Sequence, residues 1–232
     1  MHTAVDLLET LNAPAYKIAS FEVLDLPLIR YVASTGKPMI ISTGMADAQE
    51  IQEAIDAARE GGCKELAVLH CVSGYPAPAE DYNLRTIPDM IERFGLVTGL
   101  SDHTLDNTTA IASVIMGASI IEKHFTLDKT LEGPDHEASL DPSELKAMID
   151  QIRLTTIALG EEVKECQPIE VSNKAAVRRS LVAKQPIAAG AVITEADLEC
   201  RRPGAGRTSF DFYEVIGSVA TQDYAVGEYV GQ

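Results

Sequence analysis

A chain of 232 residues with 46% hydrophobic and 23% charged residues has the composition of an ordinary globular protein, long enough for one large core and a small appended domain. Its formal net charge of −16 argues against a nucleic acid or an anionic membrane as partner, because no basic stripe offsets the acidic excess. Apolar stretches stay short of the roughly 20 residues that span a bilayer, and no signal region is visible at the N-terminus.

Helical patterns alternate with five strand-like runs in the first part of the chain. A short helix is expected over Thr3–Leu11, before the first run. The runs are mostly apolar throughout, which is typical of parallel strands covered on both faces. They are Tyr16–Ser20, Pro38–Thr43, Leu66–Cys71, Leu96–Asp102 and Ser119–Phe125.

Two of the helical patterns carry clear start and stop signals. Asp47 and Glu50 form a capping-box pattern at the start of a helix over 47–60, and Gly61 ends it. Asp141 precedes a second helix that runs to about Leu159, with Gly160 as its stop.

The chain changes character after about residue 165. Short β-like pieces follow at Ser180–Ala183, Ala191–Ile193 and Leu198–Arg201, and the segment 185–198 recurs faintly near the end as 222–230. We therefore expect a first domain over 1–160, a linker over 161–175 and a small all-β domain over 176–232.

Five βα units cannot close the eight-stranded (β/α)₈ barrel, so about three units would be missing if that barrel is the parent architecture. A doubly wound open sheet of five strands is the alternative, and it needs no missing piece.

The exits of the first two runs offer groups that bind anions. Lys17 lies inside an otherwise apolar run, so it must pair with an anion, and a substrate anion is favoured over a structural carboxylate. Glu22, at the end of the same segment, is counted among the candidate catalytic residues. Ser42, Thr43 and Gly44 precede a helix, where backbone N–H groups attract phosphate or carboxylate, although this signal is weak alone.

The third exit adds Ser73 and Tyr75 as possible anion and hydroxyl contacts. His70 lies within the run and is expected to be a packed core imidazole. Cys71 is expected to be a small buried apolar residue rather than a nucleophile.

Two imidazoles follow the fourth and fifth runs at equivalent positions. In a parallel barrel those positions share one rim, so His103 and His124 are predicted to bind the same metal ion. Asp102 and Glu122 stand beside them, to orient the rings or to join the polar network.

The loop after the fifth run and the small domain add further candidates. Asp135 is expected to contact a substrate hydroxyl or to act as a general acid or base, whereas His136 is expected to be merely solvated. Arg202 belongs to the one notable basic cluster, and a guanidinium suits a carboxylate or sugar hydroxyls. The scattered cysteines, without a C-x-x-C pair, indicate reduced thiols and a cytoplasmic location.

Taken in order, these segments resemble the sialic acid synthase family, which makes N-acetylneuraminate, legionaminate and pseudaminate. The segments that carry the resemblance are YKIASFE (16–22), STGM (42–45), HCVSGYPAP (70–78), GLSDHT (99–104), EKHFTLDK (122–129), EGPDHEASLDP (132–142) and RRPGAG (201–206). The resemblance implies an N-terminally truncated chain: the last five or so βα units of a TIM barrel, followed by an antifreeze-like (SAF, β-clip) domain.

The resemblance also implies an activity. Such enzymes condense phosphoenolpyruvate with an N-acylated amino sugar, such as N-acetylmannosamine, and release phosphate with a divalent metal, typically Mn²⁺ with Mg²⁺ as the other possibility. His103 and His124 match the metal ligands, and Tyr75 and Asp135 fall near the reacting centre. The positions that match phosphoenolpyruvate contacts are Lys17, Ser20, Ser42, Ser73 and Ser101.

A domain-swapped homodimer is implied as well, with Arg202 reaching from one subunit's small domain into the other subunit's barrel. Ser73 stands where the N-acetylneuraminate branch commonly has Asn, and Phe21 points to the pseudaminate branch. The segment EGPDHEASLDP (132–142) is more similar to the N-acetylneuraminate branch, so the sugar is left open. Two other readings are also left open: a pyruvate-dependent metal aldolase, and a non-catalytic fragment that binds sugar or a partner chain.

Overall fold

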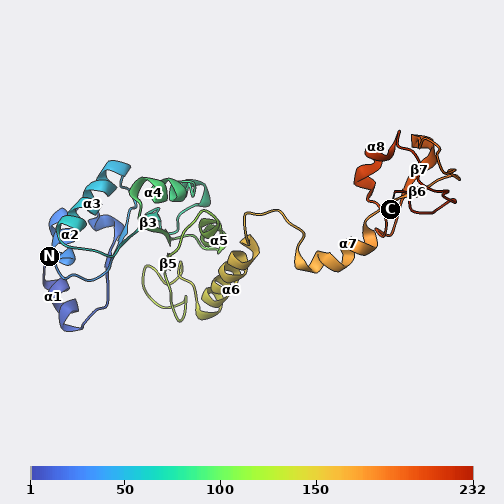
Figure 1. Cartoon of the computed structure of the whole chain (residues 1–232). Coiled ribbons are helices and arrows are strands. Elements are labelled where there is room, and N and C mark those ends of the chain that lie inside the picture. Colours follow the sequence, from blue (N-terminus) through green and yellow to red (C-terminus); the bar gives the residue numbers. More distant parts are fainter. Residues whose placement is uncertain (1, 232) are drawn as a thin grey trace. The chain divides into compact units, whose positions relative to one another are not determined.

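The computed structural model describes residues 2–231, which form two compact units that meet between Glu161 and Glu162. In Figure 1 the first unit runs from blue to olive and contains α1 to α6, and the second unit, in orange to red, contains α7, β6, β7 and α8. Within residues 2–231, each helix is too short or too polar to cross a bilayer.

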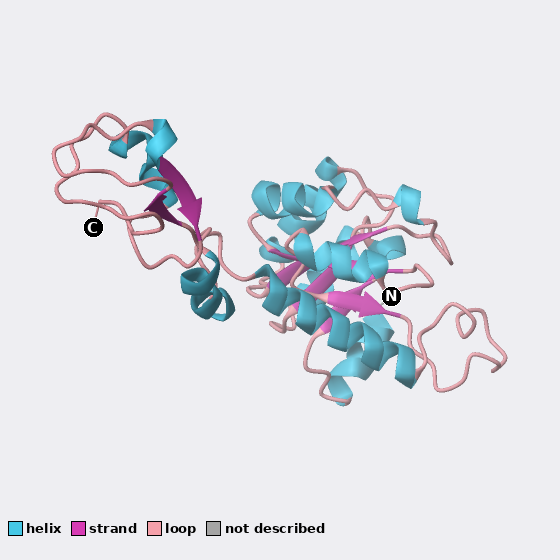
Figure 2. Cartoon of the chain, turned by 90° about the vertical axis from the view of Figure 1, so that its right-hand side faces the viewer, coloured by secondary structure: helices cyan, strands magenta, loops and turns pink. Residues whose placement is uncertain are grey.

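The first unit is built on a parallel five-stranded sheet, seen as magenta arrows lying side by side in Figure 2. Each strand lies within one of the predicted runs, at the bounds β1 Tyr16–Ile18, β2 Met39–Ser42, β3 Leu66–Cys71, β4 Val97–Asp102 and β5 Ile121–Lys123. The register pairs Ile18 with Ile41, Ser42 with Leu69, and Asp102 with Lys123, so the carboxyl ends of the strands share one edge.

Helices connect the strands, and the two predicted capping boxes are present. The Asp47 carboxylate accepts the N–H groups of Gln49 and Glu50, and Asp141 does the same for Ser143 and Glu144. The α-helices are α1 His2–Thr10, α2 Leu26–Ala33, α3 Ala48–Glu60, α4 Thr86–Phe94, α5 Thr108–Ile115 and α6 Pro142–Leu159. Two short 3₁₀ turns, Ser20–Glu22 and Ala79–Asp81, complete the unit.

The strand order argues against the open doubly wound sheet. The order is β1-β2-β3-β4-β5, with no reversal, whereas a doubly wound sheet has a switch point at which the order turns back. Right-handed crossovers that always advance in one direction place their helices on the same face of the sheet. This is the connectivity of a barrel segment.

The main core lies between the sheet and the helices α1 to α3. Val68 of β3, Ile29 of α2 and Ala58 of α3 are fully buried there, and Val5 of α1 joins the same cluster. The β-branched residues suit the strands, and the small alanines let α3 approach closely. This packing fixes the strands whose ends carry the polar side chains.

The second unit has an antiparallel pair, β6 Ser180–Ala183 and β7 Leu198–Arg201, with helices α7 Val171–Val177 and α8 Phe212–Val215. The 3₁₀ turns here are Pro168–Glu170, Glu195–Asp197 and Ser209–Asp211. Helix α7 begins within the expected linker, 161–175. The expected β-like piece Ala191–Ile193 is not a full strand, and only a single bridge joins Val192 to Val219.

The faint internal repeat corresponds to a structural pairing. Ile187 and Tyr224 occupy equivalent positions of the two copies, and each donates its N–H to the other's carbonyl, at 2.9 and 2.8 Å. Both are buried, at 4% exposure, in the core of this unit. The repeated sequence therefore corresponds to two similar segments that pair with each other through backbone hydrogen bonds.

Candidate active site

A pocket of about 370 Å³ opens at the carboxyl ends of the five parallel strands. Every strand of the sheet contributes to its wall, which is the placement expected when parallel strands share an edge. The lining residues are Lys17, Ala19, Ser20, Ser42, Cys71, Tyr75, Ser101, His103, Glu122, Lys123 and His124. The structure thus brings most of the predicted site residues into one cavity.

The two predicted metal-binding imidazoles lie together in this pocket. The ring centroids of His103 and His124 are 5.4 Å apart. The ring of Tyr75 contacts both, at centroid distances of 4.2 Å from His103 and 5.6 Å from His124. Three aromatic rings from the ends of β3, β4 and β5 therefore meet at one point.

His103 is held firmly by its neighbours. Its Nδ1 lies 2.9 Å from the carbonyl oxygen of Val72, which can only accept, so Nδ1 carries the hydrogen and Nε2 carries the lone pair. Its backbone N–H donates to the Tyr82 hydroxyl at 2.6 Å, and its carbonyl accepts from Ala77 at 3.1 Å. The ring is thus fixed in the tautomer that can present Nε2 to a metal.

His124 is held more loosely. Its carbonyl accepts the N–H of Leu140 at 2.9 Å, while its Nδ1 lies 3.8 Å from the carboxylate of Asp135. The side chains of His124 and Asp135 are 35% and 53% exposed. Asp135 therefore lies beside the imidazole pair, at a distance that a small side-chain movement would turn into a hydrogen bond.

Ser101, Glu122 and Lys17 form a polar chain across the pocket. Ser101 Oγ donates to Glu122 Oε1 at 2.7 Å, and Lys17 Nζ lies 3.6 Å from the same oxygen. Lys17 also donates to the carbonyl of Ile18 at 2.9 Å. The Lys17 ammonium thus faces the Glu122 carboxylate only at long range. This geometry is compatible with both predicted partners of Lys17, a substrate anion and a structural carboxylate.

Serines line the β1 and β2 side of the pocket. Ser20 Oγ accepts the N–H of Gly44 at 3.0 Å. The Oγ of Ser42, 2% exposed as a residue, has no hydrogen-bond partner within residues 2–231. A buried hydroxyl without a partner is uncommon, and a ligand oxygen in the pocket would satisfy it.

The turn after β2 has room only for a glycine at position 44. A Cβ at this position would lie 2.3 Å from Ser73 Oγ and 2.8 Å from Ser20 Oγ. Ser73, although outside the pocket lining, therefore packs directly behind the β2 exit, where it and Ser20 enclose the Gly44 backbone.

Cys71 is buried, as expected, but it is not merely an apolar filler. Its Sγ lies 4.0 Å from His103 Nδ1 and 3.9 Å from Ser73 Oγ. Burial raises the pKa of this thiol, and hydrogen bonds from His103, Ser20 and Ser73 together lower it by more, so the net pKa is below the usual value. In His103, burial lowers the pKa, and the bonds to Cys71 and Val72 raise it by more.

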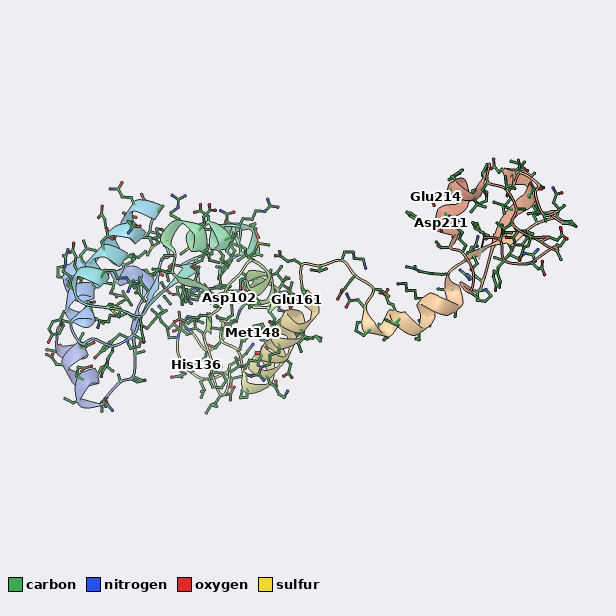
Figure 3. All side chains as sticks on the ribbon, in the orientation of Figure 1. Asp102, His136, Met148, Glu161, Asp211 and Glu214 are labelled. Atoms are coloured by element: carbon green, nitrogen blue, oxygen red, sulfur yellow. The ribbon has the colours of Figure 1, made fainter. Side chains whose placement is uncertain are left out.

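The acidic residues beside the imidazoles join the polar network rather than orient the rings. Asp102 bonds to Lys123 at 2.7 Å, and Glu122 bonds to Ser101. Asp102 lies in the interior of the first unit (Figure 3). The sequence argument missed Lys123, which lines the pocket yet has a side chain only 2% exposed.

Two further histidines test the sequence argument. His70 Nε2 lies 2.5 Å from the carbonyl of Tyr82, and burial lowers its pKa, which confirms a packed core imidazole. The expectation that His136 is merely solvated was wrong: its Nδ1 bonds to Thr126 Oγ1 at 2.8 Å, which anchors the loop, although the residue stays half-buried.

The remaining predicted residues lie outside the pocket wall. Glu22 ends the 3₁₀ turn after β1 and is partly buried. Arg202, in the second unit, is exposed, and its Nε donates to the carbonyl of Val177 at 2.8 Å.

The donor set of the pocket fits a divalent ion with a small number of protein ligands. Within residues 2–231, no group of three His, Cys, Asp or Glu side chains is arranged to hold a metal. His103 Nε2 and the His124 ring are the two nitrogen donors. An ion here would complete its coordination with oxygen atoms of water or substrate; imidazole donors suit transition-metal ions, and oxygen ligands suit Mn²⁺ and Mg²⁺.

Each of the two units matches a known protein family or domain. The NeuB family matches residues 1–164, and the SAF domain matches residues 178–231. The chain is 41% identical over 229 residues to N,N'-diacetyllegionaminic acid synthase of Campylobacter jejuni, covering 98% of this chain and 69% of that protein. It is 40% identical over 219 residues to pseudaminic acid synthase of Helicobacter pylori, covering 94% and 64%.

Solved structures of related proteins are similar to this chain as well. The crystal structure of spore coat polysaccharide biosynthesis protein SpsE from Bacillus subtilis is similar with a TM-score of 0.66 and 36% identity, covering 100% of this chain and 70% of that one. N-acetylneuraminic acid synthetase from Leptospira borgpetersenii, crystallised with citrate, gives a TM-score of 0.67 at 32% identity, covering 73% and 59%. The chain spans 60% to 69% of the length of the first curated relatives it matches.

Proposed function

This chain belongs to the NeuB family, and on that premise we propose that it supplies the metal- and phosphoenolpyruvate-binding part of an enzyme that makes a nonulosonic acid. In the proposed reaction, C3 of phosphoenolpyruvate bonds to the aldehyde carbon of an open-chain N-acylated amino sugar. Water adds at C2 and inorganic phosphate leaves, so the product carries a keto group. N-acetylmannosamine, or a close relative of it, is the proposed sugar.

One observation carries this proposal: two imidazoles, 5.4 Å apart, share a pocket with a lysine and a buried hydroxyl that lacks a partner. Phosphoenolpyruvate is a small trianion with oxygen atoms at both ends. The pocket offers such a molecule nitrogen donors for a cation on one side and hydrogen-bond donors for anionic oxygens on the other.

The β1 and β2 side is proposed to hold the anionic oxygens. Lys17 is 3.6 Å from Glu122, so its ammonium can turn toward a closer anion. Ser42 Oγ, unpartnered within residues 2–231, is available to donate, and the hydroxyl of Ser20 lines the same wall, while Ser101 is proposed to contribute its hydroxyl from β4. Ser73 is proposed to support this wall from behind, through its packing against Gly44.

The β4 and β5 side is proposed to bind Mn²⁺, or Mg²⁺, through His103 and His124. A bound divalent ion would act as a Lewis acid that polarises the sugar aldehyde. Tyr75, which packs against both rings, is proposed to orient the reacting groups and exclude water from one side. Asp135 is proposed to contact a sugar hydroxyl or transfer a proton, and Glu22 is retained only as a more distant candidate.

The parent architecture is proposed to be the TIM barrel, with the first unit supplying five of its eight strands in sequential order. The edge strands β1 and β5 each pair on one side only within residues 2–231. Closing the barrel then requires βα units from outside this chain, together with the substrate contacts that they carry.

A domain-swapped homodimer is the proposed assembly. Large apolar side chains are exposed at the strand exits, including Phe21, Met45 and Leu105, and others are exposed in the second unit, including Phe210 and Tyr213. In a homodimer, the second unit of one copy would cover the rim of the other and bring Arg202 to the sugar. The cysteines are free thiols, which suits the proposed cytoplasmic location.

Binding of phosphoenolpyruvate beside Mn²⁺ tests the proposal on this chain directly. We expect Mn²⁺ bound by the chain to broaden the ³¹P resonance of phosphoenolpyruvate, because the phosphorus would lie within a pocket of about 370 Å³ with the ion. His124→Ala should abolish the effect, and Lys146→Met, which changes an exposed ion pair on α6, should leave it intact. Equal broadening in His124→Ala would refute the proposed site.

Turnover is tested by adding the missing βα units as a second polypeptide, with phosphoenolpyruvate and N-acetylmannosamine as substrates. Release of inorganic phosphate together with a nonulosonic acid supports the synthase. Reaction of pyruvate with the sugar, without phosphate release from phosphoenolpyruvate, would identify an aldolase. Arg202→Ala is expected to raise the apparent KM for the sugar more than it changes the affinity for Mn²⁺.

A further inference from the structure

A buried ion pair lies directly behind the two imidazoles. Lys123 Nζ lies 2.7 Å from Asp102 Oδ2, and the two side chains are 2% and 0% exposed. An ion pair removed from water on both sides is costly unless all its hydrogen-bonding groups are satisfied. The presence of this buried pair is therefore not explained by surface charge and needs a structural reason.

The three hydrogens of the Lys123 ammonium are fully used, and both oxygens of Asp102 accept hydrogen bonds. Besides Asp102, Lys123 Nζ donates to the carbonyl oxygens of Thr104 and Asp106, at 2.6 and 3.1 Å. An ammonium has three hydrogens, and these three oxygens account for them. The other oxygen of Asp102 accepts the N–H and hydroxyl of Thr104, at 2.9 and 2.8 Å. Lys123 therefore has no donor left for a substrate anion, although it lines the pocket.

The pair joins the two strand ends that carry the imidazoles. Asp102 and Lys123 are register partners, at the last paired position of β4 and β5. His103 and His124 are the next residues in sequence. Alternation along a strand points the side chains of Asp102 and Lys123 to the opposite face of the sheet from those of Ser101 and Glu122.

The two imidazoles depend on this link to different extents. His103 has its own anchors in Val72, Tyr82 and Ala77. The His124 ring has Asp135 at 3.8 Å and ring contacts. Its place is set by the backbone at the end of β5, a strand of three residues at the edge of the sheet, where the His124 carbonyl also accepts the N–H of Leu140 at 2.9 Å. A link from β5 to the well-anchored end of β4 would fix the second ring relative to the first.

We infer that Lys123 and Asp102 are positioning residues that set the separation of His103 and His124, and thereby the affinity of the pocket for a divalent ion. The inference rests on the proposed function for the purpose of the two rings, but the geometry that it predicts exists without metal. Lys123 acts through the backbone it ties down and does not itself contact substrate.

The test uses the whole chain with the double substitution Asp102→Asn and Lys123→Met. Removing both charges avoids leaving one buried ion unpaired, so this variant should fold where either single variant is at risk. In metal-free protein with labelled histidines and tyrosines, the nuclear Overhauser effect between the rings of His103 and His124 should be lost. The effect between Tyr75 and His103, whose centroids are 4.2 Å apart, should remain, because neither ring belongs to β5.

Mn²⁺ affinity gives the second readout, with an expected loss of at least tenfold in the double variant. Lys146→Met, at the exposed pair with Asp150 on α6, is the matched control and should change neither readout. Retention of both ring contacts in the double variant would overturn the inference. Loss of both contacts would also count against it, since a link acting on β5 leaves Tyr75 and His103 in place.

The two proposals fail in different ways. If the unsubstituted chain binds no Mn²⁺ while the ring contacts behave as stated, the metal site is wrong and the positioning role stands. If Mn²⁺ binding is unchanged in the double variant and depends on His124, the metal site stands and the positioning role is wrong.

Discussion

On the β4–β5 side of the pocket, Lys123 is buried and shares its ammonium hydrogens among Asp102, Thr104 and Asp106, whereas on the β1–β2 side Lys17 has a side chain 30% exposed and lies 3.6 Å from its nearest carboxylate. The serines follow the same division. Ser101 donates to Glu122, but Ser42 Oγ has no partner within residues 2–231. The polar groups of the β4–β5 side, the saturated side, bond to other groups of the chain. The β1–β2 side, the open side, keeps polar groups that can still bond to a ligand.

This difference separates two tasks that the same residue types perform. Groups whose bonds are satisfied within the chain hold other groups in place, and groups with unused capacity are the ones that can bind a ligand. The division predicts that removing a group whose bonds are satisfied within the chain mainly lowers the free energy of unfolding, and that removing a group with unused capacity mainly lowers ligand affinity.

The largest effect is expected from Lys123→Met. It leaves the Asp102 carboxylate buried without its counter-ion, so the free energy of unfolding should fall by about 3–5 kcal/mol. Urea denaturation of the variant and the unsubstituted chain measures the difference. A loss below about 1 kcal/mol, the range of an exposed ion pair, would show that the pair is not buried in solution.

Tyr82→Phe should have the next largest effect. The Tyr82 hydroxyl accepts the N–H of His103 at 2.6 Å in a fully buried setting, and phenylalanine would leave that N–H unsatisfied. We expect a loss of about 1–3 kcal/mol in the free energy of unfolding, from the same denaturation measurement. Unchanged stability would mean that water replaces the hydroxyl, and that His103 is less firmly held than described.

Ser42→Ala and Ser113→Ala form a matched pair of smaller effects. Both serines are buried, but Ser113 Oγ donates to the carbonyl of Ala110 at 2.7 Å, whereas Ser42 Oγ has no partner within residues 2–231. Ser113→Ala should cost about 1 kcal/mol of stability. Ser42→Ala should leave stability unchanged or higher and weaken phosphoenolpyruvate binding several-fold. The reverse order of stability would contradict the assignment of Ser42 to the open side.

Lys17→Met should change the free energy of unfolding little, by less than about 1 kcal/mol, because the ammonium is partly exposed and its carboxylate partner is distant. It should weaken the binding of phosphoenolpyruvate at least tenfold, as calorimetry can determine. A variant that keeps full affinity would show that Lys17 is a partner of Glu122 rather than of the substrate.

The sequence predicted those parts of the site that depend on strand ends. Period and apolar composition located the five strands, and the shared edge of parallel strands then brought His103, His124 and Ser42 together. It could not predict Lys123, because a lysine next to a histidine in a short edge strand reads as exposed. Only the register of β4 with β5 shows that Asp102 lies opposite.

The errors have a similar origin. His136 was expected to be solvated because its loop is polar, but loop closure brings Thr126 within 2.8 Å. Ala191–Ile193 was expected to be a short β-like piece, and tertiary packing leaves it a single bridge. Local composition carries no information about which distant segment a loop will meet.

Electron paramagnetic resonance of Mn²⁺ titrated into the chain tests the central claim most directly. We expect one Mn²⁺ bound per chain, with affinity at least 100-fold lower in both His103→Ala and His124→Ala and unchanged in His70→Ala, provided that each variant keeps its fold. Binding that survives the loss of either ring, or that depends equally on His70, would contradict a divalent ion shared by the two strand-end imidazoles.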